Sequence, residues 1–88
     1  MLIELLNDGE EPILTLTTEI LTGHIAVYHG DRIWRTEADP DWTLSETAQA
    51  LIDLTQEADI PEDLRKLGIA ALQNSASRPW FGMVSAIV

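Results

Sequence analysis

The two histidines, His24 and His29, are the first candidates for chemistry, because the chain contains no cysteine. Without cysteine there are no disulfides, no thiolate metal sites and no thiol nucleophiles. The two histidines lie in a segment whose apolar and β-branched residues predict a strand. Side chains an odd number of residues apart on a strand point to opposite faces, so these two cannot converge on one metal ion. We interpret them as ordinary surface histidines.

The remaining sequence lacks the motifs that usually support catalysis. No serine stands in a Gly-x-Ser-x-Gly elbow, and there is no glycine-rich phosphate loop or paired-histidine helix motif. The pair Asp39 and Asp41 lacks the further spaced ligands and the glycine of a calcium loop. We therefore predict that the protein is not an enzyme and that it holds no metal or cofactor.

The most unusual feature is a run of acidic residues without any lysine or arginine between positions 37 and 63. We call its nine carboxylates the acidic tract: Glu37, Asp39, Asp41, Glu46, Asp53, Glu57, Asp59, Glu62 and Asp63. Protein surfaces ordinarily mix the two signs of charge. A run of this kind is either a solvated face or a surface for a basic partner. We predict partner binding for all of these residues except Asp59.

The spacing of Glu46, Asp53 and Glu57 adds a geometric argument. They stand at i, i+7 and i+11, so a helix places them along one side. With a rise of about 1.5 Å per residue, the two steps are roughly 10 and 6 Å. These steps are loosely commensurate with the phosphates of a nucleic-acid strand, at about 3.4 Å of axis each. Such a helix could compete for a basic groove that otherwise holds DNA or RNA.

The overall charge limits the partners. Fifteen acids against five bases give a formal net charge of −10. Naked nucleic acid and anionic membranes are poor partners, because both require lysine and arginine. In size and charge the chain is similar to small phage anti-defence proteins, including DNA mimics and anti-CRISPR inhibitors. The similarity is one of general character, and an antitoxin or immunity protein would share it.

A second candidate surface lies near the C-terminus. Arg78, Trp80, Phe81 and Met83 have the composition of a binding hot spot, although such aromatics also cap small cores. A C-terminal strand at a sheet edge would allow homodimerisation by strand pairing. The alternative function is therefore a structural or accessory subunit that docks through apolar surface.

The first half of the chain predicts four strands. Apolar runs at 1–6 and 13–21 are separated by the turn residues 7–12. Segments 24–29 and 32–36 flank Gly30 and Asp31, which fit a two-residue hairpin turn with His29 opposite Arg32. In this register Val27 pairs with Trp34, and we expect this pair to contact the helices.

The segment from 42 to 74 predicts two helices. Thr43 and Glu46 match a capping box, and the first helix should stop near Ala58. We expect Asp59 to cap the second helix, with Pro61 in its first turn and Glu62 paired with Lys66. The predicted buried stripe of this helix is Ile60, Leu64, Leu67, Gly68, Ala71 and Leu72. Gly68 would then allow the first helix to cross closely, and Ile69 would be exposed.

Together these elements predict a single α+β domain spanning residues 1–88. A small antiparallel sheet of about four to five strands packs on a two-helix hairpin, in the order ββββααβ. The N-terminus lacks the basic region of a signal peptide, and the longest apolar segment is far shorter than the ~20 residues of a membrane helix. We expect a cytoplasmic protein.

Overall fold

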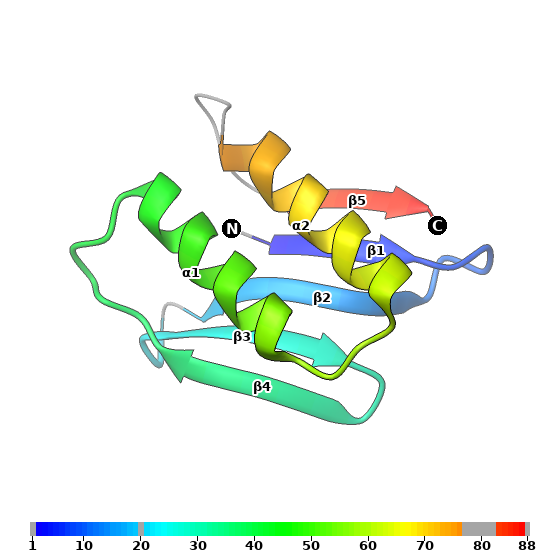
Figure 1. Ribbon diagram of the computed structural model, residues 1–88, viewed down its shortest axis with the longest axis horizontal. Helices are drawn as coiled ribbons and strands as arrows, with labels where there is room; N and C mark the ends of the chain where they lie inside the picture. Colours follow the sequence, from blue (N-terminus) through cyan, green and yellow to red (C-terminus); the bar gives the residue numbers. More distant parts are fainter. Residues whose placement is uncertain (1, 20, 77–82, 88) are drawn as a thin grey trace.

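The computed structural model describes residues 2–19, 21–76 and 83–87 (Figure 1). Its elements confirm the predicted α+β fold and the order ββββααβ. They are β1 (Leu2–Leu6), β2 (Pro12–Glu19), β3 (His24–His29), β4 (Arg32–Glu37), α1 (Leu44–Glu57), α2 (Glu62–Ala76) and β5 (Met83–Ile87). Neither helix of the described ranges has the length and apolar character needed to cross a membrane.

The five strands form one sheet in the order β4-β3-β2-β1-β5. Strands β1 to β4 make an antiparallel meander, whereas β5 runs parallel to β1, with Leu2 opposite Met83. The sheet is therefore not antiparallel throughout. The two helices lie on one face and carry the chain from β4 at one edge of the sheet to β5 at the other edge, where β5 pairs with β1.

The hairpin formed by β3 and β4 has the predicted register. His29 lies opposite Arg32 and Val27 lies opposite Trp34. Gly30 in the turn has a φ of 62°, a left-handed conformation that glycine adopts without steric cost. Val27 is fully buried and Trp34 packs against the core, so the predicted contact of this pair with the helical layer is confirmed.

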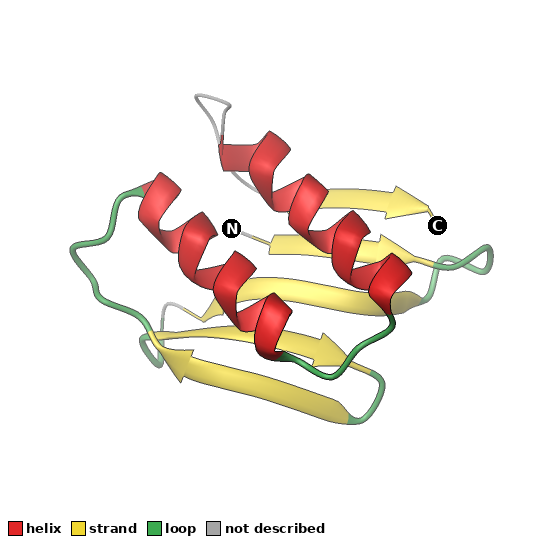
Figure 2. Cartoon of the chain, viewed as in Figure 1, coloured by secondary structure: helices red, strands yellow, loops and turns green. Residues whose placement is uncertain are grey.

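Both helices cover the same face of the sheet, and the core lies between the two layers (Figure 2). Its buried members are Ile3, Leu5, Leu14, Leu16, Ile25, Val27, Leu51, Ile52, Leu54, Ala58, Ile60 and Leu72. The predicted capping box of α1 is present. Thr43 Oγ1 accepts from the Glu46 amide at 3.1 Å, and Glu46 Oε1 accepts from the Thr43 amide at 3.1 Å.

The start of α2 differs from the prediction. The helix begins at Glu62, and the Pro61 carbonyl accepts the first helical hydrogen bond from the Arg65 amide at 3.0 Å. Asp59 does not occupy the predicted cap position, because Pro61 is the residue that precedes the helix, and the Asp59 carboxylate accepts from Arg32. Glu62 pairs with Arg65 at 2.9 Å and not with Lys66, since positions three apart on a helix are also neighbours.

The buried stripe of α2 is rotated slightly from the prediction. Leu67 is 43% exposed, whereas Ile69 is half-buried and packs against the core. Gly68 does allow a close approach, but the neighbour is β2 and not α1. A Cβ added at Gly68 would lie 3.0 Å from Leu14 Cδ2 and 3.2 Å from Leu16 Cδ1. Gly68 therefore sets the distance between α2 and the sheet.

Candidate protein-binding surface

The acidic tract follows the chain along one continuous path from the end of β4 to the start of α2 (Figure 1). Every one of its nine side chains is exposed. Glu37, Asp39 and Asp41 lie at the end of β4 and in the β4–α1 loop; Glu46, Asp53 and Glu57 lie on α1; Asp59, Glu62 and Asp63 lie in the α1–α2 turn and the first turn of α2.

Hydrogen bonds fix the conformation of the β4–α1 loop. Asp39 Oδ1 accepts from the Asp41 amide at 2.9 Å, and the Asp39 carbonyl accepts from the Trp42 amide at 3.1 Å. The Ala38 amide donates to the Gly23 carbonyl at 2.8 Å, which ties the loop to the β2–β3 turn. The carboxylates of this loop are thus presented by a backbone with a defined shape.

On α1 the three acidic residues share the solvent-facing side, opposite the residues buried in the core. Glu46 also takes part in the capping box, and Asp53 Oδ1 accepts from Gln49 Nε2 at 3.1 Å. A carboxylate in the first turn of a helix is favourable because of the helix dipole, whereas Glu57 in the last turn is not. The structure therefore contains at least one acidic residue, Glu57, that local helix stability does not explain.

Arginines neutralise only part of the tract. Arg32 Nη1 lies 3.2 Å from Asp59 Oδ2, and Arg65 Nη1 lies 2.9 Å from Glu62 Oε2. Arg65 also donates to the carbonyls of Ala58 and Ile60, so it stabilises the α1–α2 turn. The other seven carboxylates form no ion pair with the residues that the structure describes.

A separate polar cluster lies on the sheet face that the helices leave uncovered. Arg35 Nε donates to Glu19 Oε1 at 2.8 Å, and Arg35 Nη2 donates to the Tyr28 hydroxyl at 3.1 Å. The hydrogen bond from Arg35 lowers the pKa of Glu19 below its ordinary value, and the same bond raises the pKa of Arg35. This pair holds β2 and β4 together across β3 and is not part of the acidic tract.

The two histidines lie apart, as predicted. In β3, His24 lies between Glu19 of β2 and Glu37 of β4, whereas His29 pairs with Arg32. Within the described residues, histidine and acidic side chains form no cluster of three or more that could hold a metal ion.

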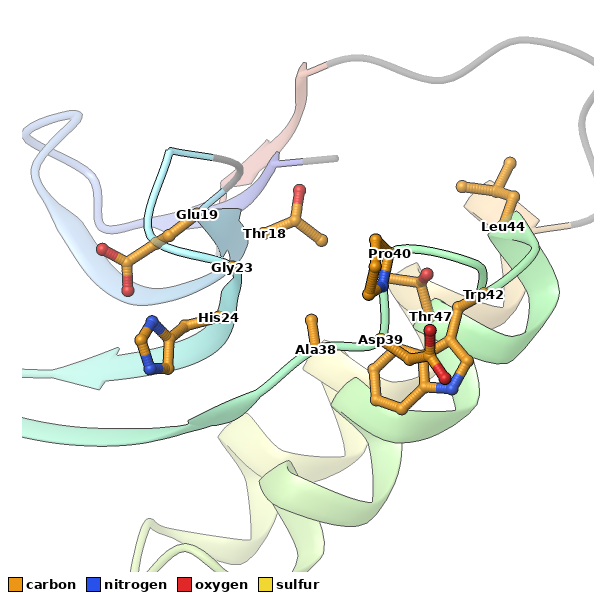
Figure 3. Close-up of a pocket in the computed structure, with 10 residues that line it drawn as sticks. All are labelled: Thr18, Glu19, Gly23, His24, Ala38, Asp39, Pro40, Trp42, Leu44 and Thr47. Atoms are coloured by element: carbon orange, nitrogen blue, oxygen red, sulfur yellow. The ribbon is translucent and has the colours of Figure 1, made fainter.

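An open cleft of about 590 Å³ lies where the β4–α1 loop and the start of α1 meet the ends of β2 and β3 (Figure 3). Ala38, Pro40, Trp42 and Leu44 supply apolar lining, and Asp39 and Glu19 supply carboxylates. The sequence did not indicate this cleft, because its walls come from segments far apart in the chain. Only two of these segments, the turn at 22–23 and the loop at 38–41, can be recognised in the sequence from their own residues.

The second predicted surface comprises Arg78, Trp80, Phe81 and Met83. Arg78, Trp80 and Phe81 lie outside the described residues, and Met83 is described only as the first residue of β5. Strand β5 does lie at an edge of the sheet.

No known protein family, curated protein or solved structure matches this chain.

Proposed function

We propose that this protein is a non-catalytic binding module that recognises a basic surface of another protein through the acidic tract. One observation carries the proposal: all nine carboxylates are exposed, and seven form no ion pair among the described residues. Surface charges that are not neutralised internally remain available to attract and orient an oppositely charged partner. The proposal includes action in the cytoplasm, in keeping with a chain that contains no cysteine.

The most concrete form of this proposal is an inhibitor of a protein that handles nucleic acid. Glu46, Asp53 and Glu57 lie on one α-helix, and helical geometry spaces their carboxylates by roughly 10 and 6 Å along its axis. A basic groove that binds phosphates presents lysine and arginine along its length. Occupation of that groove by the acidic tract would exclude DNA or RNA.

A direct test uses a fluorescently labelled oligoarginine peptide as a model basic ligand. Fluorescence anisotropy would give its affinity for the protein between about 50 and 300 mM salt, because screening weakens exposed charge pairs over this range. We expect the affinity to fall at least about tenfold. Absence of binding at the lowest salt concentration would contradict the proposal.

The alternative, an accessory subunit that docks through Arg78, Trp80, Phe81 and Met83, makes a different prediction. Association through apolar surface depends little on salt. Self-association measured by analytical ultracentrifugation that persists at high salt, and that Trp80→Ala abolishes, would favour this homodimer or accessory role. Charge reversal in the acidic tract would then change little.

A further inference from the structure

The cleft beside the acidic tract gives the proposed binding surface an apolar recess. Figure 3 shows the side chains of Thr18, Ala38 and Pro40 around the opening, with Trp42, Leu44 and Thr47 toward α1. The volume of about 590 Å³ falls in the range of roughly 300–1,000 Å³ that is typical of ligand pockets. This is enough space for a large apolar side chain.

The walls of the cleft are connected to the rigid parts of the fold. Ala38 and Trp42 pack against the hydrophobic core. The Ala38 amide bonds to the Gly23 carbonyl, and Thr47 Oγ1 donates to the Thr43 carbonyl at 3.0 Å. Because these contacts exist without a ligand, a binding group would not need to order the loop, and this lowers the entropic cost of binding.

The charge around the cleft identifies the kind of group that fits it. Asp39 lines the cleft, and Glu37, Asp41 and Glu46 belong to the same short segment of chain. The four carboxylates of that segment are exposed and none forms an ion pair with a described residue, whereas Glu19, which also lines the cleft, is paired with Arg35. An apolar side chain flanked by acidic residues would be repelled here, whereas one flanked by lysine or arginine would be attracted.

We propose that this cleft receives an aromatic side chain of the partner protein that is flanked by basic residues. The proposal rests on the proposed function and makes it more specific. The acidic tract supplies long-range attraction, and the cleft supplies the buried anchor. Hot spots at interfaces have this arrangement, in which a desolvated aromatic residue is surrounded by polar contacts.

The test compares two labelled peptides, Arg-Lys-Phe-Lys-Arg and Arg-Lys-Ser-Lys-Arg, which carry equal charge and differ only at the centre. Burial of a phenylalanine side chain corresponds to an affinity gain of about ten- to a hundredfold. We expect the phenylalanine peptide to bind at least about tenfold more tightly. The ratio should persist as salt weakens both peptides, because screening acts on the charges that the peptides share.

A variant whose cleft is blocked can be compared with a variant that carries the same substitution elsewhere. Ala38→Phe would place a ring in the opening, whereas Ala70→Phe places the same side chain on the exposed side of α2. We expect the first variant to bind both peptides equally and the second to keep the preference. If Ala38→Phe does not fold, NMR spectra of the wild-type protein, recorded with each peptide in turn, test whether the cleft is the binding site. The phenylalanine peptide alone should then shift the Gly23 and Thr47 amides and the Trp42 indole signal.

The outcomes separate this inference from the proposed function. Equal, salt-sensitive binding of both peptides, with no shifts at the cleft, would overturn the anchor and leave the acidic binding surface intact. Absence of binding by either peptide at low salt would contradict both. A phenylalanine preference that Ala38→Phe leaves unchanged would place the aromatic group elsewhere and would overturn the cleft as its site.

Discussion

Arg32 Nη1 lies 3.2 Å from Asp59 Oδ2, so the turn of the β3–β4 hairpin is joined to the turn between the two helices. The guanidinium carbon of Arg32 lies 4.7 Å from the centre of the Trp34 ring. Both side chains of the ion pair are well exposed, and exposed pairs of this kind contribute only about 0–1 kcal/mol to stability. The main consequence of the pair is therefore electrostatic: it neutralises one carboxylate of the acidic tract.

Removal of this pair should make the tract a stronger ligand for cations. We predict that Arg32→Gln changes the free energy of unfolding by less than about 1 kcal/mol and raises affinity for the oligoarginine peptide by about two- to threefold. Arg35→Gln is the charge-matched control, because Arg35 pairs with Glu19, which is not one of the nine carboxylates of the tract. Equal effects of the two variants would show that only net charge matters.

The capping box at the start of α1 should contribute measurably to stability. Thr43→Ala leaves the Glu46 amide without its side-chain acceptor, so we expect a loss of about 1 kcal/mol in the free energy of unfolding. Urea denaturation followed by circular dichroism would measure it. Ser45→Ala is the control, because this exposed residue of the first turn has no capping role in the box. A loss of equal size in both variants would rule out the box as its cause.

The close approach of α2 to β2 predicts that an alanine at position 68 is harmful. Gly68→Ala normally favours a helix by about 1 kcal/mol. Here the new Cβ would meet Leu14 and Leu16, and overpacking typically costs about 1–3 kcal/mol. We predict that Gly68→Ala lowers the free energy of unfolding. The loss caused by Gly68→Ala should be smaller when it is introduced into a Leu14→Val variant than into the wild type. A stabilised single variant would contradict the tight packing.

The Glu19–Arg35 pair predicts a dependence of stability on pH. The hydrogen bond from Arg35 lowers the pKa of Glu19 from its ordinary value of 4.5. The ionised group therefore stabilises the folded state above that value, and this contribution is lost as pH falls through the lowered pKa. The difference in melting temperature between the wild type and Glu19→Gln should be constant near neutral pH and shrink below 4.5. The same difference measured in an Arg35→Gln background, which lacks the hydrogen-bond donor, should not shrink in this way.

The sequence predicted those features of the fold that depend on neighbouring residues. The hairpin turn at Gly30 fixed the register of β3 and β4, and the capping box fixed the start of α1. The contact of Val27 and Trp34 with the helical layer followed from that register. In each case the physical cause lies within a few residues of chain, so the pattern carries the information.

Features that depend on distant segments could not be predicted in this way. Asp59 looked like a helix cap, but Arg32 lies close to it only in the folded chain. The close neighbour of Gly68 was assigned to α1, although it is β2. The cleft beside Trp42 was missed for the same reason, because two turns and a helix start must first be brought together. The acidic tract was visible in the sequence. Of the two ion pairs that neutralise part of it, Glu62–Arg65 joins neighbours on one helix, whereas Arg32–Asp59 joins segments far apart in the chain.

The central claim is that the acidic tract binds a cationic partner. It is tested most directly by reversing the same number of charges either within the tract or outside it. Asp53→Lys with Glu57→Lys reverses two exposed carboxylates on α1, and Glu10→Lys with Glu11→Lys makes the same change in the β1–β2 loop. A lysine at position 57, in the last turn of α1, interacts favourably with the helix dipole, and both positions are exposed, so folding should be preserved. Oligoarginine affinity at low salt should fall at least about tenfold for the first variant and about two- to threefold for the second. Equal losses in both would contradict a localised binding surface.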